Sequence, residues 1–126
     1  YQEIAAKGGG IVSTMRATRE ASIEELERLA LERAKEAYAF GVRTMEAKSG
    51  YGLSTDAELK QLEVVKRLQR KMPEMRFVPT FLGAHAFPPD RSRERYLSDI
   101  IDDMLPKVAR RRLAAACDVF VDKGYF

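Results

Sequence analysis

The feature that most constrains the fold of this chain is a helical pattern followed by a short apolar run, repeated three times. The first helix is predicted to begin at Ser22, because Glu25 stands three residues later, as in a capping box. Apolar residues then recur at helical spacing until Gly41, a residue type common at helix C-termini. Residues 42–48 are predicted to form the strand that follows.

The second repeat has the same order. A helix is predicted from about Thr55, with Glu58 three residues later, and it ends before Pro73. Residues 76–83 are predicted as the next strand, although Pro79 within them cannot donate a hydrogen bond to a neighbouring strand.

The third repeat is longer and contains a proline. A helical pattern covers residues 93–115, and Pro106 must kink this helix or open a second one. Residues 117–121 are predicted as the third strand. Near the start of the chain, we expect the three glycines at 8–10 to close an opening helix and residues 11–14 to be extended.

Strands separated by helices of this length predict βαβ units, and therefore an α/β fold with parallel strands. The 126 residues amount to at most half of the about 250 residues of a complete (β/α)8 TIM barrel. No low-complexity linker interrupts the pattern, so residues 1–126 are expected to belong to one domain. The chain opens without Met in a helix-like stretch and stops directly after a strand-like run, so we expect an internal fragment of a longer protein.

The composition indicates the cellular compartment of the chain and limits the kinds of metal site that it can form. No run approaches the ~18 apolar residues of a membrane span, so we expect a cytoplasmic chain with no membrane partner. Cys117 is the only cysteine, which excludes an internal disulfide and fits a reducing compartment. With His85 as the only histidine, the chain cannot supply the three or four ligands of a usual zinc site, so no metal ligand is expected in it.

The net charge of +3 includes two groups of arginines, within residues 91–95 and 110–112. Such groups indicate either nucleic-acid binding or a solvated helix face. Aromatic residues are not interleaved with the arginines, and three aspartates lie between the two groups. We therefore expect no nucleic-acid partner.

Two side chains follow predicted strands, at the edge where parallel α/β folds gather functional groups. Tyr51 lies between Gly50 and Gly52, which allow a tight turn that projects the phenol; a plain turn with a packing tyrosine is the alternative. His85 precedes a Phe-Pro-Pro turn, and its imidazole can donate or accept hydrogen bonds; a structural histidine is the alternative. These residues predict a ligand site near Tyr51 and His85.

Charged residues also stand within the predicted strands. Glu46 and Lys48 are two apart and share a face, which is either the mouth of a barrel lumen or an edge strand. Asp122 and Lys123 raise the same alternatives. We expect Glu46 and Lys48 to be structural rather than catalytic, and Cys117 to lie in the core rather than to react.

Four segments of the chain carry a resemblance. They are Gly9-Gly10-Ile11-Val12-Ser13-Thr14 with Arg16-Ala17-Thr18-Arg19, Glu46-Ala47-Lys48-Ser49-Gly50-Tyr51-Gly52-Leu53, Thr80-Phe81-Leu82-Gly83-Ala84-His85-Ala86, and Asp118-Val119-Phe120 with Lys123-Gly124. In this order and spacing, over essentially the whole chain, they resemble the imidazolonepropionase family of the amidohydrolase superfamily.

The resemblance implies a (β/α)8 barrel with a small β-sandwich, of which this chain would form about the second to fourth βα units. It implies hydrolysis of the small molecule 4-imidazolone-5-propanoate to N-formimidoyl-L-glutamate in histidine degradation. One zinc or iron would supply a bound water that attacks the ring carbonyl, and the C–N bond would open through a tetrahedral oxyanion. A homodimer is left open as the assembly.

Carried over residue by residue, Tyr51 matches a tyrosine that contacts substrate and His85 a substrate-binding histidine. The family's metal ligands, an H-x-H on the first barrel strand with a His and an Asp on late strands, lie outside this chain. Its substrate-binding arginine does too, so neither Arg16 nor Arg19 receives that role. The chain departs from the family's Cys-Glu at Val121-Asp122, so no role is carried to that position.

The alternative function is a small non-enzymatic α/β module, such as a flavodoxin-like regulatory or ligand-binding domain. Such a module would need about five strands, whereas three are predicted here. It would also need an acidic phospho-acceptor cluster or a phosphate-binding turn, and the sequence has neither.

Overall fold

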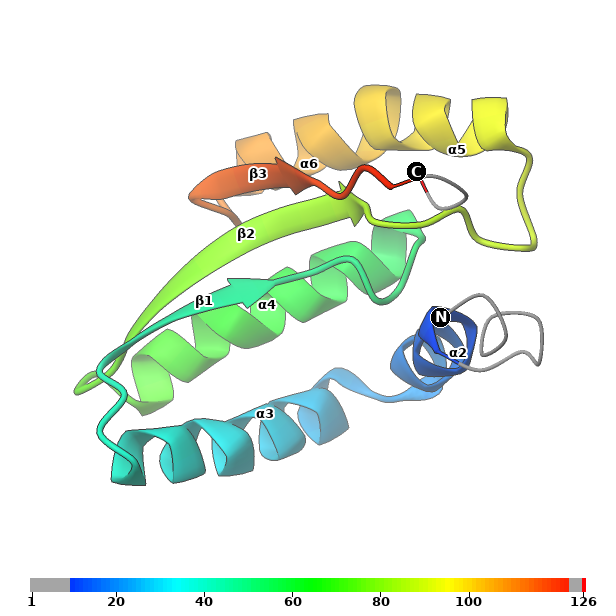
Figure 1. Ribbon diagram of the computed structural model, residues 1–126. Coiled ribbons are helices and arrows are strands. Elements are labelled where there is room, and N and C mark those ends of the chain that lie inside the picture. The colour runs from blue at the N-terminus through cyan, green and yellow to red at the C-terminus, as the bar shows by residue number, and fades with distance from the viewer. Residues whose placement is uncertain (1–9, 123–125) are drawn as a thin grey trace.

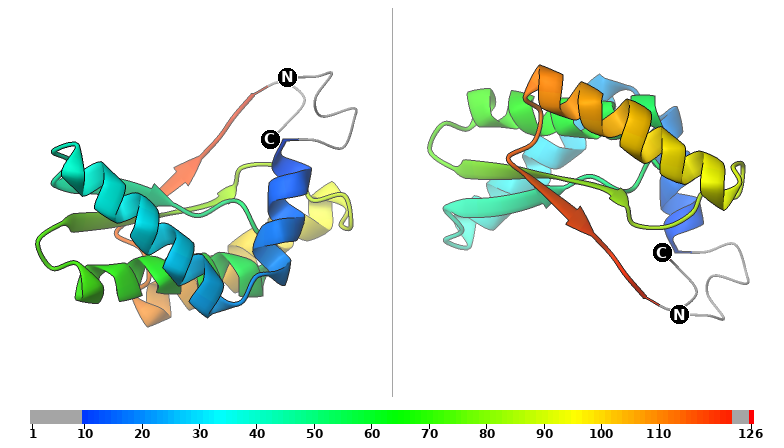
Figure 2. Two further views of the ribbon diagram at one scale, coloured as in Figure 1. Left: turned by 90° about the horizontal axis from the view of Figure 1, so that it is seen from below. Right: turned by 90° about the horizontal axis from the view of Figure 1, so that it is seen from above.

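The computed structural model describes residues 10–122 and 126, and shows a three-stranded sheet with helices packed on one face (Figures 1 and 2). In chain order the elements are α2 (Ile11–Glu20), α3 (Ile23–Ala39), β1 (Thr44–Lys48), α4 (Thr55–Lys71), β2 (Arg76–Ala84), α5 (Arg93–Ser98), the π-helix η1 (Asp99–Met104), α6 (Leu105–Arg111) and β3 (Ala116–Val119). The strands lie in the order β1-β2-β3, and both pairs are parallel. The predicted α/β fold with parallel strands is confirmed.

Local signals in the sequence explain where the first long helix begins and ends. The Ser22 hydroxyl accepts a hydrogen bond from the Glu25 N–H at 3.1 Å, as predicted for the N-cap of α3. At the other end Gly41 adopts φ 97°, and the Val42 N–H donates to the Ala37 carbonyl at 3.0 Å. This left-handed glycine closes the helix as expected and turns the chain into β1.

The expectation for residues 11–14 is wrong. These residues are the first part of α2, which begins after Gly10. Met15 and Thr18 are buried one helical turn apart, so α2 is fixed by the side it packs against the rest of the chain. Glycines 8 and 9 and the opening stretch lie outside the described residues.

In the third helical region Pro106 opens a second helix, which is one of the two alternatives expected, and a π-helical stretch precedes it. Pro106 lies in the first turn of α6, where its missing N–H is tolerated, and η1 precedes it. The helix ends at Arg111 rather than near residue 115, because Arg112 adopts a left-handed φ of 51°.

Pro79 lies within β2, paired with Ala47 of β1, and leaves the ladder intact. Its carbonyl accepts a hydrogen bond from the Ala115 N–H at 2.8 Å. The nitrogen and the carbonyl of a strand residue point to the same side, so the Pro79 nitrogen, which has no hydrogen, faces the segment just before β3. The proline therefore removes no hydrogen bond from the paired part of the sheet.

Two apolar clusters occupy the space between the sheet and its helices. The first gathers around Phe81, Tyr96 and Met104, and the second around Phe77, Leu68 and Met75. Tyr96 is fully buried and donates its hydroxyl to the Gly83 carbonyl at 2.8 Å, and burial raises the pKa of this phenol. The clusters fix the helix-facing side of β1 and β2 and leave their other side free for polar residues.

Both arginine groups contain a member that forms an ion pair within the chain. Arg91 lies 3.0 Å from the Asp99 carboxylate, and Arg111 lies 3.4 Å from that of Glu63. In the part of the chain that the structure describes, no helix is long and apolar enough to cross a membrane.

Candidate functional site

The loop of residues 49–53 leaves β1 at the carboxyl edge of the sheet and is fixed tightly against β2. Ser49 is buried; its N–H donates to the Thr80 carbonyl, and its hydroxyl accepts from the Leu82 N–H, both at 3.0 Å. Gly50 adopts φ 96°, and a Cβ there would collide with the Leu82 carbonyl oxygen. The turn next to Tyr51 therefore requires a glycine at position 50.

A buried carboxylate holds this loop from the helix side. Glu58, in the first turn of α4, is 0% exposed and accepts hydrogen bonds from the N–H groups of Gly50 (2.6 Å), Gly52 (3.0 Å) and Leu53 (2.8 Å). The sequence indicated Glu58 only as a mark of the helix start. Its position a few residues after a glycine-rich turn was the one available signal of this second role.

Arg19 of α2 holds the same loop from the other side. Its guanidinium donates to the carbonyls of Gly52 (2.7 Å) and Leu53 (2.9 Å) and forms an ion pair with Asp90 at 2.8 Å. The hydrogen bond from Arg19 lowers the pKa of the Asp90 carboxyl. Three N–H groups and two carbonyls of the loop are thus satisfied by side chains from two different helices.

The structure brings Tyr51 and His85 together at the carboxyl edge of the sheet. Their ring centroids are 5.1 Å apart and the rings are nearly perpendicular, at 80°. His85 also lies edge-on to Phe120, at 5.6 Å between centroids. Tyr51 is 41% exposed and His85 is half-buried, so both rings border open space.

A hydrogen bond to the loop determines which nitrogen of His85 carries a proton. His85 Nδ1 lies 2.7 Å from the Gly50 carbonyl oxygen, which can only accept, so Nδ1 must donate. Within the described residues neither His85 Nε2 nor the Tyr51 hydroxyl has a hydrogen-bond partner. The pair therefore offers one imidazole nitrogen and one phenol to a ligand at this edge.

Charged residues cross the open face of the sheet next to this edge. Lys48 contacts the carboxylates of Asp118 (2.5 Å) and Glu46 (3.8 Å), and Glu46 accepts from the Thr80 hydroxyl at 2.8 Å. The hydrogen bond between Lys48 and Asp118 raises the pKa of the lysine and lowers that of the aspartate. Glu46 and Lys48 share a face as expected, and the missed partner is Asp118 on β3.

The expectation that Cys117 lies in the core is wrong. The residue is exposed. Partial burial of the thiol, with Asp118 beside it, still raises the pKa of Cys117. A raised pKa disfavours the thiolate form of Cys117. Of the other charged pair, Asp122 lies beyond the end of β3, and Lys123 is outside the described residues.

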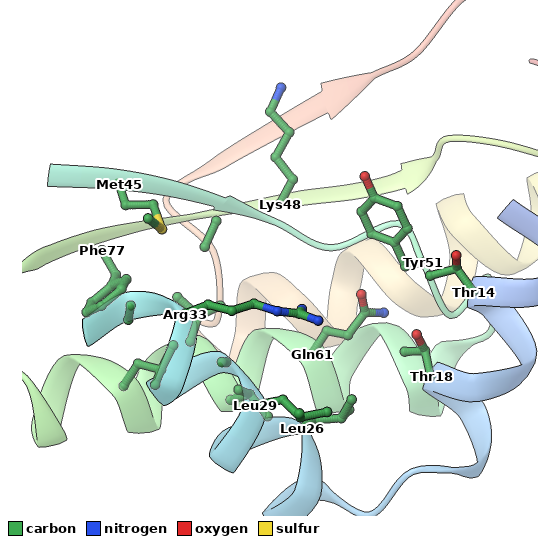
Figure 3. A pocket seen from close by; sticks show the side chains of 16 residues that line it. Thr14, Thr18, Leu26, Leu29, Arg33, Met45, Lys48, Tyr51, Gln61 and Phe77 are labelled. Carbon is green, nitrogen blue, oxygen red and sulfur yellow. The ribbon is translucent and has the colours of Figure 1, made fainter. Parts of the chain in front are cut away.

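A cleft of about 400 Å³ lies between α2, α3, α4 and the outer edge of β1 (Figure 3). Its walls are mostly aliphatic, and Tyr51 and Lys48 border it, whereas His85 does not. Figure 3 shows Lys48 and Tyr51 directed to one side of β1, with Arg33 and Gln61 on the other. The cleft is thus distinct from the space that Tyr51 and His85 face together.

Metal-ligating side chains do not cluster in the described residues. Among residues 10–122 and 126, no three His, Cys, Asp or Glu side chains come close enough to hold a metal ion. The described residues therefore do not fit a metal of the kind that the resemblance implies.

Comparison with known proteins finds similar sequences along the whole chain. No family model matches the chain. Curated imidazolonepropionases are similar to all of it, among them those of Alkaliphilus metalliredigens (48% identity), Clostridium tetani (51%) and Myxococcus xanthus (52%). The chain spans about 30% of the length of these relatives.

Proposed function

Because the chain belongs to the imidazolonepropionase family, we propose that it is part of a longer hydrolase that converts 4-imidazolone-5-propanoate to N-formimidoyl-L-glutamate in histidine degradation. The observation that carries the proposal is the similarity of 45–52% over the whole chain. The convergence of Tyr51 and His85 at one sheet edge supports it. A flavodoxin-like module has no such support.

We propose further that the chain forms about the second to fourth βα units of a (β/α)8 barrel, with residues 1–126 in that one domain. Consecutive parallel strands with their helices on one face support this arrangement. In a closed barrel the strand before β1 would pair with its free edge. That strand would lie against the aliphatic cleft that borders the edge.

The family's zinc or iron would be held by residues outside this chain, because the described residues provide no group that fits it. The part of the reaction that can be assigned here is binding and orientation. His85 Nε2 would accept a hydrogen bond from a ring N–H of the substrate, and the Tyr51 hydroxyl would donate one to its carbonyl or carboxylate. Orientation of this kind contributes to the rate, because a displaced carbonyl reacts more slowly.

The free thiol of Cys117 and the metabolic role fit a cytoplasmic enzyme, which is the location we propose. A homodimer remains the proposed assembly.

The test is an assay of the full-length protein, loaded with zinc or iron, on 4-imidazolone-5-propanoate. The proposal expects loss of the imidazolone absorbance and stoichiometric appearance of N-formimidoyl-L-glutamate by mass spectrometry. A loaded enzyme that leaves this compound intact while it opens a different cyclic amide would refute the assigned substrate.

A further inference from the structure

Glu58 is a fully buried carboxylate whose partners all belong to one functional loop. Its two oxygens accept from the N–H groups of Gly50, Gly52 and Leu53, and from the Gln61 side chain at 3.3 Å. In the part of the chain that the structure describes, no lysine or arginine forms an ion pair with it. A buried carboxylate is tolerated only when several donors compensate it, and here the loop supplies them.

Gly50 stands between this carboxylate and the imidazole. Its N–H donates to Glu58 at 2.6 Å, and its carbonyl accepts from His85 Nδ1 at 2.7 Å. The backbone at Gly50, where φ is 96°, passes so close to Leu82 that an added Cβ would overlap the Leu82 carbonyl oxygen. Glu58 accepts from the Gly50 N–H before this carbonyl and from the Gly52 and Leu53 N–H groups after it, so Glu58 helps to hold the direction of the carbonyl and with it the proton position on His85.

We propose that Glu58 is a positioning residue, which holds the backbone on both sides of the Gly50 carbonyl so that His85 carries its proton on Nδ1 and presents Nε2, beside Tyr51, to the substrate. The idea rests on the proposed function for the identity of the substrate. It does not rest on that function for the tautomer, which is a property of the free protein. Glu58 itself is enclosed and makes no contact with the open edge.

The first arm of the test needs no change in the binding loop. Full-length protein in its zinc form, with ¹⁵N-labelled histidine, gives imidazole spectra in which the two tautomers are distinguished; His85→Gln identifies the signals of this residue. The proposal expects a proton on Nδ1 and an unprotonated Nε2 in the neutral ring. A proton on Nε2, or an even mixture of tautomers, would overturn it.

The second arm compares Glu58→Gln with Glu63→Gln, the same chemical change on the same helix but in a side chain that pairs with Arg111. The amide of Glu58→Gln places an NH2 against N–H donors, which should release Gly50. We expect a mixture of His85 tautomers and a fall in kcat/KM of about 10- to 100-fold, and wild-type behaviour in Glu63→Gln. Glu58→Asp, which keeps the charge, should lie between the two.

A lower Tm for Glu58→Gln with an unchanged His85 tautomer and unchanged kcat/KM would reduce Glu58 to a structural residue and overturn the proposal. If that variant does not fold, Glu58→Asp takes its place, and an unchanged His85 tautomer with unchanged kcat/KM in Glu58→Asp would overturn the proposal. Failure of the proposed function would show separately, as absence of turnover in the unmutated enzyme.

Discussion

The loop after β1 and the strand β3 both contribute to the edge that carries Tyr51 and His85, yet they are built in different ways. In the loop, buried polar groups find partners within the chain, from Glu58 on one side to Arg19 on the other. β3 has four residues, a register irregularity against β2, and apolar side chains in solvent, with Val121 just beyond it 76% exposed. The loop is determined by this chain alone, whereas β3 lacks a neighbour that would cover it.

The largest effect should follow from breaking the loop with Gly50→Ala, compared with Gly41→Ala. Both glycines have a positive φ, near 96°, but a Cβ at Gly41 meets nothing within 4 Å, whereas one at Gly50 collides with Leu82. The conformational term is about 1–2 kcal/mol at each position, and overpacking adds about 1–3 kcal/mol at Gly50 only. Urea unfolding of the full-length protein measures both changes in the free energy of unfolding.

Equal losses of stability in the two variants would show that the loop can move away from Leu82. The loop would then be no better determined than β3.

A second, smaller effect should appear at the exposed strand when the 126 residues are produced alone. The isolated chain should associate through its open edges and bind no zinc stoichiometrically. Val121→Lys should weaken this association about tenfold, since burial of one valine contributes about 1.5 kcal/mol or more. Ile101→Lys, on the helix side at 60% exposure, is the matched control and should change it little. Sedimentation velocity over a concentration series gives both values.

Greater weakening by Ile101→Lys than by Val121→Lys would place the uncovered surface on the helices. A cooperative thermal transition of a monomeric chain would show that β3 needs no neighbour.

The smallest effect concerns the ion pair between Lys48 and Asp118, which joins the two regions. Lys48 lowers the pKa of Asp118 below its ordinary value of 3.8. The ion pair therefore stabilises the fold fully above pH 3.8, and this stabilisation is lost as the pH falls through the lowered pKa of Asp118. Lys48→Met should therefore destabilise the full-length protein slightly at pH 6, and the difference should be smaller at about pH 3, below the ordinary pKa of 3.8. Unfolding by urea at both pH values measures this; a difference that grows on acidification would contradict it.

The sequence was sufficient to predict the helices and strands because their bounds depend on local signals. Ser22 caps its helix, Gly41 ends it, and the three strands lie within about two residues of their predicted bounds. Tyr51 and His85 could be brought to one edge because consecutive parallel strands place their carboxyl ends side by side.

What the sequence missed depends on contacts between distant segments. Residues 11–14 have the β-branched composition of a strand but form a helix, because Met15 and Thr18 find a packing surface one turn apart. The partnership of Glu58 with Gly50 requires the loop to fold back on its helix, and that of Lys48 with Asp118 requires the register of the whole sheet. Spacing in the sequence does not determine either contact, although the position of Glu58 a few residues after a glycine-rich turn is a signal of the first.

The most direct test of the account is the kinetics of His85→Ala and Tyr51→Phe in the full-length enzyme, with 4-imidazolone-5-propanoate as substrate. Each variant should lose a hydrogen bond of about 1–3 kcal/mol, or about 5- to 150-fold in kcat/KM, with unaltered metal content. Tyr38→Phe, which removes a phenol hydroxyl on α3, is the control and should behave as the unmutated enzyme. Loss of metal in either site variant, or unchanged kcat/KM in both, would contradict the assignment of Tyr51 and His85 as the substrate-contacting pair.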